Sequence, residues 1–315
     1  MPPTVHNAPA ASGVSGFSPV TFGPLSAILP SRMLVSECPL WHPQQQLLYW
    51  VDIPACTVHQ FDPLSGRHQS WLMPSDAAAL AWVADGVIVA LRSGFVHLNS
   101  ATGAISNIAN APYDTSKIRC NDGKADAHGR FWVGTLYEPR NEQAAEMLCL
   151  ERGKLRRIWQ GGMTVSNGLA FARDGKTLFH ADTTSHQIRC HTLDPLTASV
   201  GPARVLHQFS TVKDEHYGGR PDGAAIDSEG AYWSSMFEGG RLLRLTPGGE
   251  ILQEVPLPLR CPTMLAFGGS DCKTLYITSA SQNRPAAELA QYPLSGCVLS
   301  MRVSVAGLSE PAYLP

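Results

Sequence analysis

The sequence predicts an all-β fold, a six-bladed β-propeller, and three observations support this prediction. Short runs of β-branched and aromatic residues, bounded by Gly, Pro, Asp and Asn, recur along the chain, whereas helical periodicity is hard to find. The runs repeat at roughly 40 to 55 residues, the spacing of four-stranded propeller blades. A chain of 315 residues with 44% hydrophobic composition can bury the large core that such a single domain needs.

Each repeat contains a strand of small residues, a tight turn and a β-branched or aromatic strand. In chain order the second strands span residues 47–53, 86–98, 129–137, 176–182, 230–236 and 273–280. A further hairpin follows most of them and supplies the third and fourth strands, as in the segment 242–255. An irregular β-sandwich is the alternative, but a sandwich does not require the same turn six times.

Six such units fill residues 31–315, which we assign to one propeller domain. Residues 31–36 are expected to add a strand to the last blade and so close the ring, because an open sheet edge invites aggregation. Residues 1–30 are interpreted as a flexible amino-terminal extension.

One polar position recurs at the same phase of several repeats. Asn121, Asn167 and Asp222 each stand eight residues before a turn glycine, and Glu37 occupies about the same phase in the first repeat. The first strand of each propeller blade lines the central channel, so residues of equal phase form a ring around the axis. We therefore expect these four side chains to converge.

Two carboxylates and two amides converging in a narrow channel would repel or remain unsatisfied unless a positive group lay among them. A hard divalent cation is the simplest such group, so the sequence predicts one central metal ion. Oxygen ligands suit Ca²⁺, Mg²⁺ or Mn²⁺, and Fe²⁺ or Zn²⁺ remain alternatives.

The charge and composition of the chain limit the classes of binding partner that we expect. The net charge of −2 provides no basic field for nucleic acid or for a membrane surface. The eight cysteines form no CxxC pair, and the first 30 residues match neither a signal peptide nor a membrane span. We expect a cytoplasmic protein, monomeric or weakly dimeric, with a small-molecule substrate.

Four segments resemble the landmarks of the regucalcin/gluconolactonase family, also called the senescence marker protein and luciferin-regenerating enzyme family. They are ECPLWHP (37–43), KIRCNDGKADAHGRFWVGT (117–135), SNGLAFARDGKTLFHAD (166–182) and RPDGAAIDSEGAYW (220–233). The resemblance implies a six-bladed propeller with Glu37, Asn167 and Asp222 as metal ligands. It also implies that Arg119 and Asn121 bind substrate, with Glu138 as the weaker match to the family's substrate-binding acid.

Members of this family typically hydrolyse sugar-acid lactones, so the resemblance implies a lactone hydrolase that produces an aldonic acid. Gluconolactone, xylonolactone and arabinonolactone are the expected kinds of substrate. In this hypothesis the metal stabilises charge on the lactone carbonyl oxygen, and Asp222 takes a proton from the attacking water. Two alternatives stay open: a calcium-binding regulatory propeller without turnover, and a phosphotriesterase or broad lactonase of the related calcium propellers.

Overall fold

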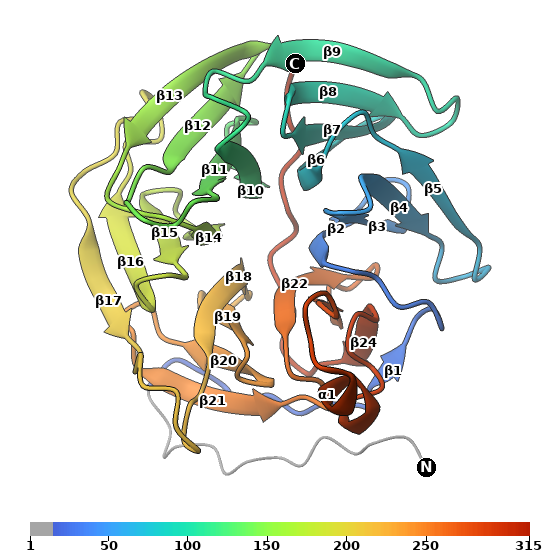
Figure 1. The fold of residues 1–315 in the computed structure, drawn as a ribbon, viewed down its shortest axis with the longest axis vertical. Helices are drawn as coiled ribbons and strands as arrows, with labels where there is room; N and C mark the ends of the chain where they lie inside the picture. The colour runs from blue at the N-terminus through green and yellow to red at the C-terminus, as the bar shows by residue number, and fades with distance from the viewer. Residues whose placement is uncertain (1–14) are drawn as a thin grey trace.

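A computed structural model describes residues 15–315 and shows six four-stranded antiparallel sheets around a central channel (Figure 1). In each of the first five sheets the strands follow one another in chain order, from the channel outward. The prediction of a six-bladed propeller is therefore confirmed. One short helix, α1 (Ala286–Gln291), is present among the described residues.

Blade 1 contains β2 (Ser36–His42), β3 (Leu47–Asp52), β4 (Thr57–Phe61) and β5 (His68–Leu72). Blade 2 contains β6 (Ala77–Val83), β7 (Gly86–Leu91), β8 (Gly94–Asn99) and β9 (Ile105–Asn110). Blade 3 contains β10 (Ile118–Ala125), β11 (Phe131–Tyr137), β12 (Glu146–Glu151) and β13 (Lys154–Gln160). Blade 4 contains β14 (Ser166–Phe171), β15 (Thr177–Asp182), β16 (Gln187–Thr192) and β17 (Arg204–Gln208). Blade 5 contains β18 (Arg220–Ile226), β19 (Tyr232–Phe237), β20 (Arg241–Leu245) and β21 (Ile251–Pro256). Blade 6 contains β22 (Pro262–Gly268), β23 (Thr274–Ser279), β24 (Leu299–Arg302) and β1 (Ser26–Ala27).

The ring closes through β1, which pairs with β24 as the outermost strand of blade 6. Leu25, which precedes β1, is buried against this blade, and Phe22 bridges to Val303. Residues 31–35 add no strand to blade 6 and contact it through the bridge between Val35 and Ala280 and through backbone hydrogen bonds such as Met33 N to Gly296 O. Ser36 begins β2 of blade 1. Residues 15–30 are therefore part of the propeller, which corrects the boundary at residue 31. The first 14 residues of the expected extension lie outside the described residues.

A β-bulge interrupts the innermost strand of every blade at the same level. The register between the first and second strands shifts after Glu37, Ala77, Cys120, Asn167, Pro221 and Pro262. A bulge re-aims the side chains beside it and commonly occurs near functional sites. The repeated bulge gives the polar positions found in the sequence a common structural origin.

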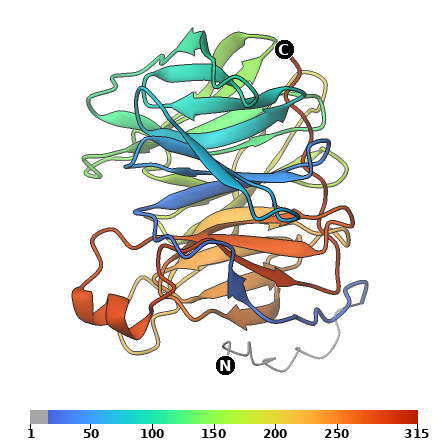
Figure 2. The same cartoon turned by 90° about the vertical axis from the view of Figure 1, so that its right-hand side faces the viewer.

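The carboxyl-terminal segment crosses one mouth of the channel (Figure 1). Backbone hydrogen bonds run from Leu308 N to Ile226 O, from Tyr313 N to Trp82 O and from Leu314 N to Gly129 O, and so join blades 5, 2 and 3. Helix α1 projects from the opposite side of the disc (Figure 2). The two mouths of the channel are thus different surfaces.

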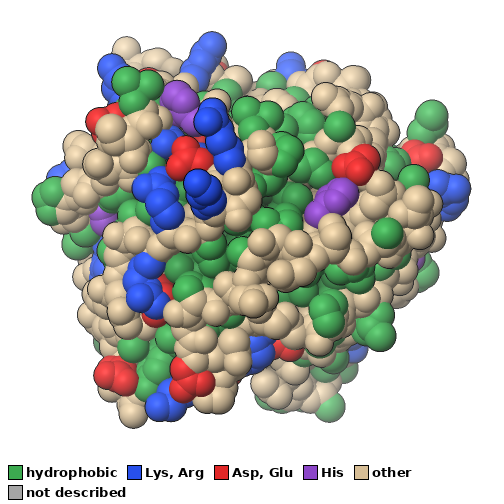
Figure 3. All heavy atoms as spheres, turned by 90° about the horizontal axis from the view of Figure 1, so that it is seen from above, with side chains coloured by type: hydrophobic (Ala, Val, Ile, Leu, Met, Phe, Trp, Pro, Cys, Tyr) green, Lys and Arg blue, Asp and Glu red, His purple; other side chains and the backbone are tan. Residues whose placement is uncertain are grey.

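Charged side chains of both signs are scattered over the side of the disc shown in Figure 3, with basic and acidic groups lying among one another. This mixture agrees with the small net charge. Within residues 15–315, no helix has the length and apolar character needed to cross a membrane.

Candidate active site

The mouth on the α1 side of the disc holds a cavity of about 310 Å³. The four side chains predicted to converge all line it: Glu37 from blade 1, Asn121 from blade 3, Asn167 from blade 4 and Asp222 from blade 5. Each belongs to the innermost strand of its blade, next to the bulge. The structure thus brings together residues that are up to 185 positions apart in the chain.

Two carboxylates of this cavity lack sufficient hydrogen-bond donors. Asp222 is 5% exposed, and its Oδ1 has no partner within residues 15–315. Glu37 Oε2 accepts only the backbone N–H of Cys38, at 3.2 Å. Burial first, and then repulsion from Asp122, raises the pKa of Asp222 well above its ordinary range, while burial and Asp222 raise the pKa of Glu37. Both carboxylates therefore need a positive partner to stay ionised.

Thr183 fixes the orientation of the Asn167 amide. The Thr183 hydroxyl donates to the carbonyl oxygen of Pro221 at 2.8 Å, because that carbonyl can only accept. Its oxygen then accepts from Asn167 Nδ2, also at 2.8 Å. Asn167 Oδ1 consequently faces away from Thr183, toward the side chain of Asn121. An amide oxygen held in this way is available as a ligand.

The side-chain nitrogen and oxygen of Asn121 are both hydrogen-bonded to neighbouring protein groups. Its Nδ2 donates to Ser166 O and to Asn167 Oδ1, both at 2.9 Å. Its Oδ1 accepts from Arg119 Nη1 at 2.8 Å, and the same Arg119 nitrogen donates to Cys120 O. The remaining guanidinium nitrogens of Arg119, Nε and Nη2, make no hydrogen bond within residues 15–315. Arg119 is thus held at one end and offers the other to the cavity that it lines.

Glu138 lies outside the residues that line the cavity. Its carboxylate accepts two hydrogen bonds from Arg92, at 2.8 and 2.9 Å, and stands 3.9 Å from Arg119 Nε. Side-chain hydrogen bonding from Arg92 lowers the pKa of Glu138. The structure thus places the Glu138 carboxylate beside Arg92 and Arg119, outside the cavity in which it was expected to contact substrate.

Besides Arg220, which lines the cavity from the start of β18, two residues in or beside the site were absent from the sequence prediction. One is Thr183, in the loop after β15. The other is Asp122, which is 4% exposed, accepts the backbone N–H of Leu169 at 2.8 Å and has an unpartnered Oδ1 among the described residues. Burial raises the pKa of Asp122 to about 6. Its position directly after Asn121 in the bulge was the available signal.

The donor set fits a hard divalent cation, because Asp222, with an unpartnered Oδ1 within residues 15–315, and Glu37, with one hydrogen bond from Cys38 N–H, line one cavity with an oriented amide oxygen. Among residues 15–315, no three side chains of His, Cys, Asp or Glu gather as a metal cluster. The predicted set requires only two such residues, Glu37 and Asp222, so this finding is compatible with it.

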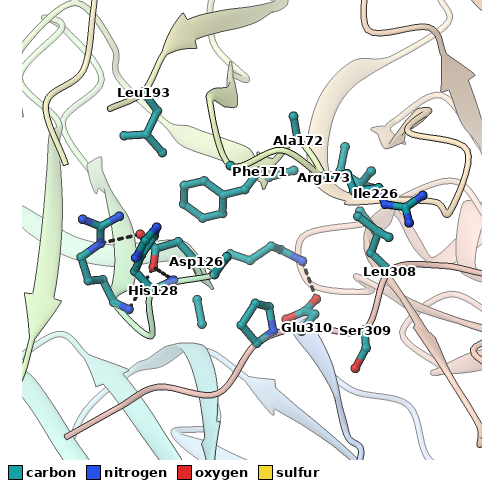
Figure 4. Close-up of a pocket in the computed structure, with 18 of the residues that line it drawn as sticks. Asp126, His128, Phe171, Ala172, Arg173, Leu193, Ile226, Leu308, Ser309 and Glu310 are labelled. Carbon is teal, nitrogen blue, oxygen red and sulfur yellow. Dashed lines mark hydrogen bonds and ion pairs between the residues drawn. The ribbon is translucent and has the colours of Figure 1, made fainter. Parts of the chain in front are cut away.

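A second cavity, of about 240 Å³, occupies the other mouth beneath the carboxyl-terminal segment (Figure 4). Its walls are mainly apolar, with Phe171, Ile226 and Leu308 among them. Lys124 Nζ forms an ion pair with Glu310 at 2.5 Å and ties that segment to β10. The polar ring belongs to the first cavity, so we place the candidate active site there.

Comparisons with known proteins agree with the fold. The family described as the SMP-30/Gluconolactonase/LRE-like region matches residues 35–281. The chain is 42% identical to a 6-deoxy-6-sulfogluconolactonase from Pseudomonas putida over 291 residues, covering 92% of this chain and 98% of that protein. It is 30% identical to regucalcin from Gallus gallus, covering 86% of this chain and 91% of the relative.

Among solved structures, a calcium-binding regucalcin from Agrobacterium tumefaciens superposes with a TM-score of 0.86 at 25% identity. The match covers 92% of this chain and 97% of that one. Together with the family match over most of the propeller, these similarities establish that the chain belongs to the SMP-30/gluconolactonase/LRE-like family.

Proposed function

We propose that this protein hydrolyses a sugar-acid lactone to the aldonic acid in a metal-dependent reaction. The observation that carries the proposal is the pair of under-satisfied carboxylates, Glu37 and Asp222, beside the oriented Asn167 amide in one cavity. Family membership and the similarity to 6-deoxy-6-sulfogluconolactonase support the assignment to lactone hydrolases. We therefore propose 6-deoxy-6-sulfogluconolactone as the first substrate to test, with gluconolactone, xylonolactone and arabinonolactone beside it.

Glu37, Asn167 and Asp222 would hold the metal. When bound, a divalent cation supplies a Lewis acid that stabilises negative charge on the lactone carbonyl oxygen. Its charge also favours the ionised carboxylates over their protonated forms, which offsets the cost of burial.

Asp222 is the proposed general base. Its ionised carboxylate accepts a proton from the water that attacks the carbonyl carbon. Addition of the water opens the carbonyl double bond and places negative charge on the carbonyl oxygen. When the double bond re-forms, the bond between the carbonyl carbon and the ring oxygen breaks, and the ring oxygen takes the proton from Asp222 to become a hydroxyl group. The product is a single aldonic acid, because the ring oxygen remains part of the same molecule.

Arg119 orients the sugar through its free Nε and Nη2, which donate to hydroxyl oxygens. Asn121 has one lone pair of Oδ1 left for a ligand and otherwise positions Arg119 and Asn167. Glu138 is proposed to act through Arg119, by balancing the charge of that guanidinium at 3.9 Å.

The test compares the wild-type protein with Asp222→Ala and with Asp85→Ala, an aspartate that is 57% exposed in its side chain and lies outside the cavity. Circular dichroism checks the fold, and acid release measures lactone opening with each of Ca²⁺, Mg²⁺, Mn²⁺, Zn²⁺ and Fe²⁺, and with a chelator. Loss of a general base is expected to lower kcat by about 10²- to 10⁴-fold in D222A only.

Undiminished turnover in D222A would contradict the role of Asp222, and turnover that persists in chelator would contradict the metal dependence. A protein that binds metal and opens no lactone would instead fit a calcium-binding propeller without turnover. Preference for bulky organophosphates or apolar lactones would fit the broader hydrolases.

A further inference from the structure

The residues two positions before the polar ring include two arginines. Arg119 precedes Asn121 and Arg220 precedes Asp222 by two residues on the innermost strands, just before the bulge of each blade. Both arginines line the cavity. They come from blades 3 and 5, on either side of blade 4, where the residue at the same phase is Val165.

Arg220 differs from Arg119 because its guanidinium makes no hydrogen bond within residues 15–315. Its Nε is buried without a partner. Its Nη2 is 3.6 Å from Glu238 Oε2, beyond hydrogen-bond distance, and the guanidinium lies over the Phe237 ring at 5.1 Å. A buried donor without a partner is costly and requires an explanation in a native structure.

Glu238, whose Oε2 is 3.6 Å from Arg220 Nη2, is already used by other cations. Its Oε2 accepts from Lys213 Nζ at 2.8 Å, and its Oε1 accepts from Arg284 Nη1 at 3.0 Å. Arg284 is further paired with Glu288 through two hydrogen bonds. Around Glu238, three cationic groups thus face two carboxylates, and Arg220 also faces the carboxylate of Asp222, with which it makes no hydrogen bond within residues 15–315.

A planar guanidinium with unused donors matches the oxygens of a carboxylate, phosphate or sulfonate. Arg220 stands two residues from Asp222, about 7 Å along an extended strand. An anionic substituent at the far end of a six-carbon lactone can therefore meet Arg220 while the lactone carbonyl lies at the polar ring.

We infer that Arg220 is a specificity residue that binds an anionic substituent, a sulfonate on the terminal carbon, of the lactone substrate. This inference rests on the proposed lactonase function. The fixed strand position and the Phe237 face hold the guanidinium in place, so the anion gains hydrogen bonds without ordering a flexible side chain.

The test measures kcat/KM of wild type, Arg220→Gln and Arg260→Gln for 6-deoxy-6-sulfogluconolactone and glucono-1,5-lactone. Arg260 is the matched control, because it occupies the same phase in blade 6, carries the same charge and does not line the cavity. Loss of charged hydrogen bonds in R220Q is expected to lower kcat/KM for the sulfonated lactone by roughly 10- to 150-fold. The glucono-lactone value should change less than about threefold, and R260Q should leave both unchanged.

An equal loss on both lactones would overturn the inference, since Arg220 would then act on the part that the two substrates share. No loss on either would also overturn it. Calorimetric binding of 6-deoxy-6-sulfogluconate and gluconate gives a second readout that does not need turnover. Wild type should prefer the sulfonated acid and R220Q should not. If the wild type opens neither lactone, the proposed function fails, and the absence or presence of this binding preference still decides the role of Arg220.

Discussion

Replacing Thr183 by Val tests whether one hydroxyl group organises the proposed metal site. Valine keeps the shape of threonine but removes the group that donates to Pro221 O and accepts from Asn167 Nδ2, both at 2.8 Å. Thr183 is 8% exposed, so water cannot easily replace it. Each buried polar group left unpaired costs about 1–3 kcal/mol, so with two such groups we expect the free energy of unfolding to fall by about 2–6 kcal/mol.

The same substitution removes one of the two hydrogen bonds that orient the Asn167 amide and leaves the one that Asn121 Nδ2 donates to Asn167 Oδ1. Loss of a residue that orients a metal ligand typically lowers metal affinity by about 10- to 100-fold. Urea unfolding in chelator measures the stability, and calorimetric titration with Ca²⁺ or Mn²⁺ measures the affinity. Thr183→Ser, which keeps the hydroxyl, should retain the wild-type affinity. A T183V protein that binds metal as tightly as wild type would refute the reasoning.

Two further predictions concern the channel below the ring. Folding raises the pKa of Asp122 from its ordinary value of 3.8 to about 6. Between these two pH values the folded state binds a proton that the unfolded state has released, so the free energy of unfolding of the metal-free protein falls by about 3 kcal/mol as the pH rises from below 3.8 to above 6. Asp122→Asn keeps an oxygen that accepts the Leu169 N–H, and it should stabilise the metal-free protein at pH 8 but hardly at pH 4. Urea unfolding at the two pH values measures this difference. Equal stabilisation at both would contradict the raised pKa of Asp122. Glu310→Gln leaves the Lys124 ammonium, 7% exposed, without its counter-charge and should lower the free energy of unfolding by about 3–5 kcal/mol, whereas the double variant K124M/E310L should recover most of it. Similar urea midpoints for E310Q and wild type would show that the carboxyl-terminal segment is not held by this pair.

The sequence could locate the ring of candidate ligands because propeller blades repeat. Residues at one phase of a repeat occupy one level around the channel, so the spacing of Asn121, Asn167 and Asp222 from their turn glycines was enough to predict that they meet. The repeat could not reveal Thr183, which lies in a loop of blade 4, or that the guanidinium of Arg220 makes no hydrogen bond within residues 15–315. Which side chains remain free depends on neighbours from other blades.

The sequence by itself determined the six-bladed architecture and the cavity-lining positions of Glu37, Asn121, Asn167 and Asp222, because both follow from local periodicity. Only the tertiary structure decided how the ring closes, since the pairing of β1 with β24 joins segments about 270 residues apart and carries no periodic signal. It also decided the hydrogen-bonding state of the arginines. Glu138 is engaged by Arg92, whereas Arg220 is left without a hydrogen bond among the described residues because Glu238 serves Lys213 and Arg284. Competition among charged groups for shared partners depends on distances in space, and these are set by the packing of the blades.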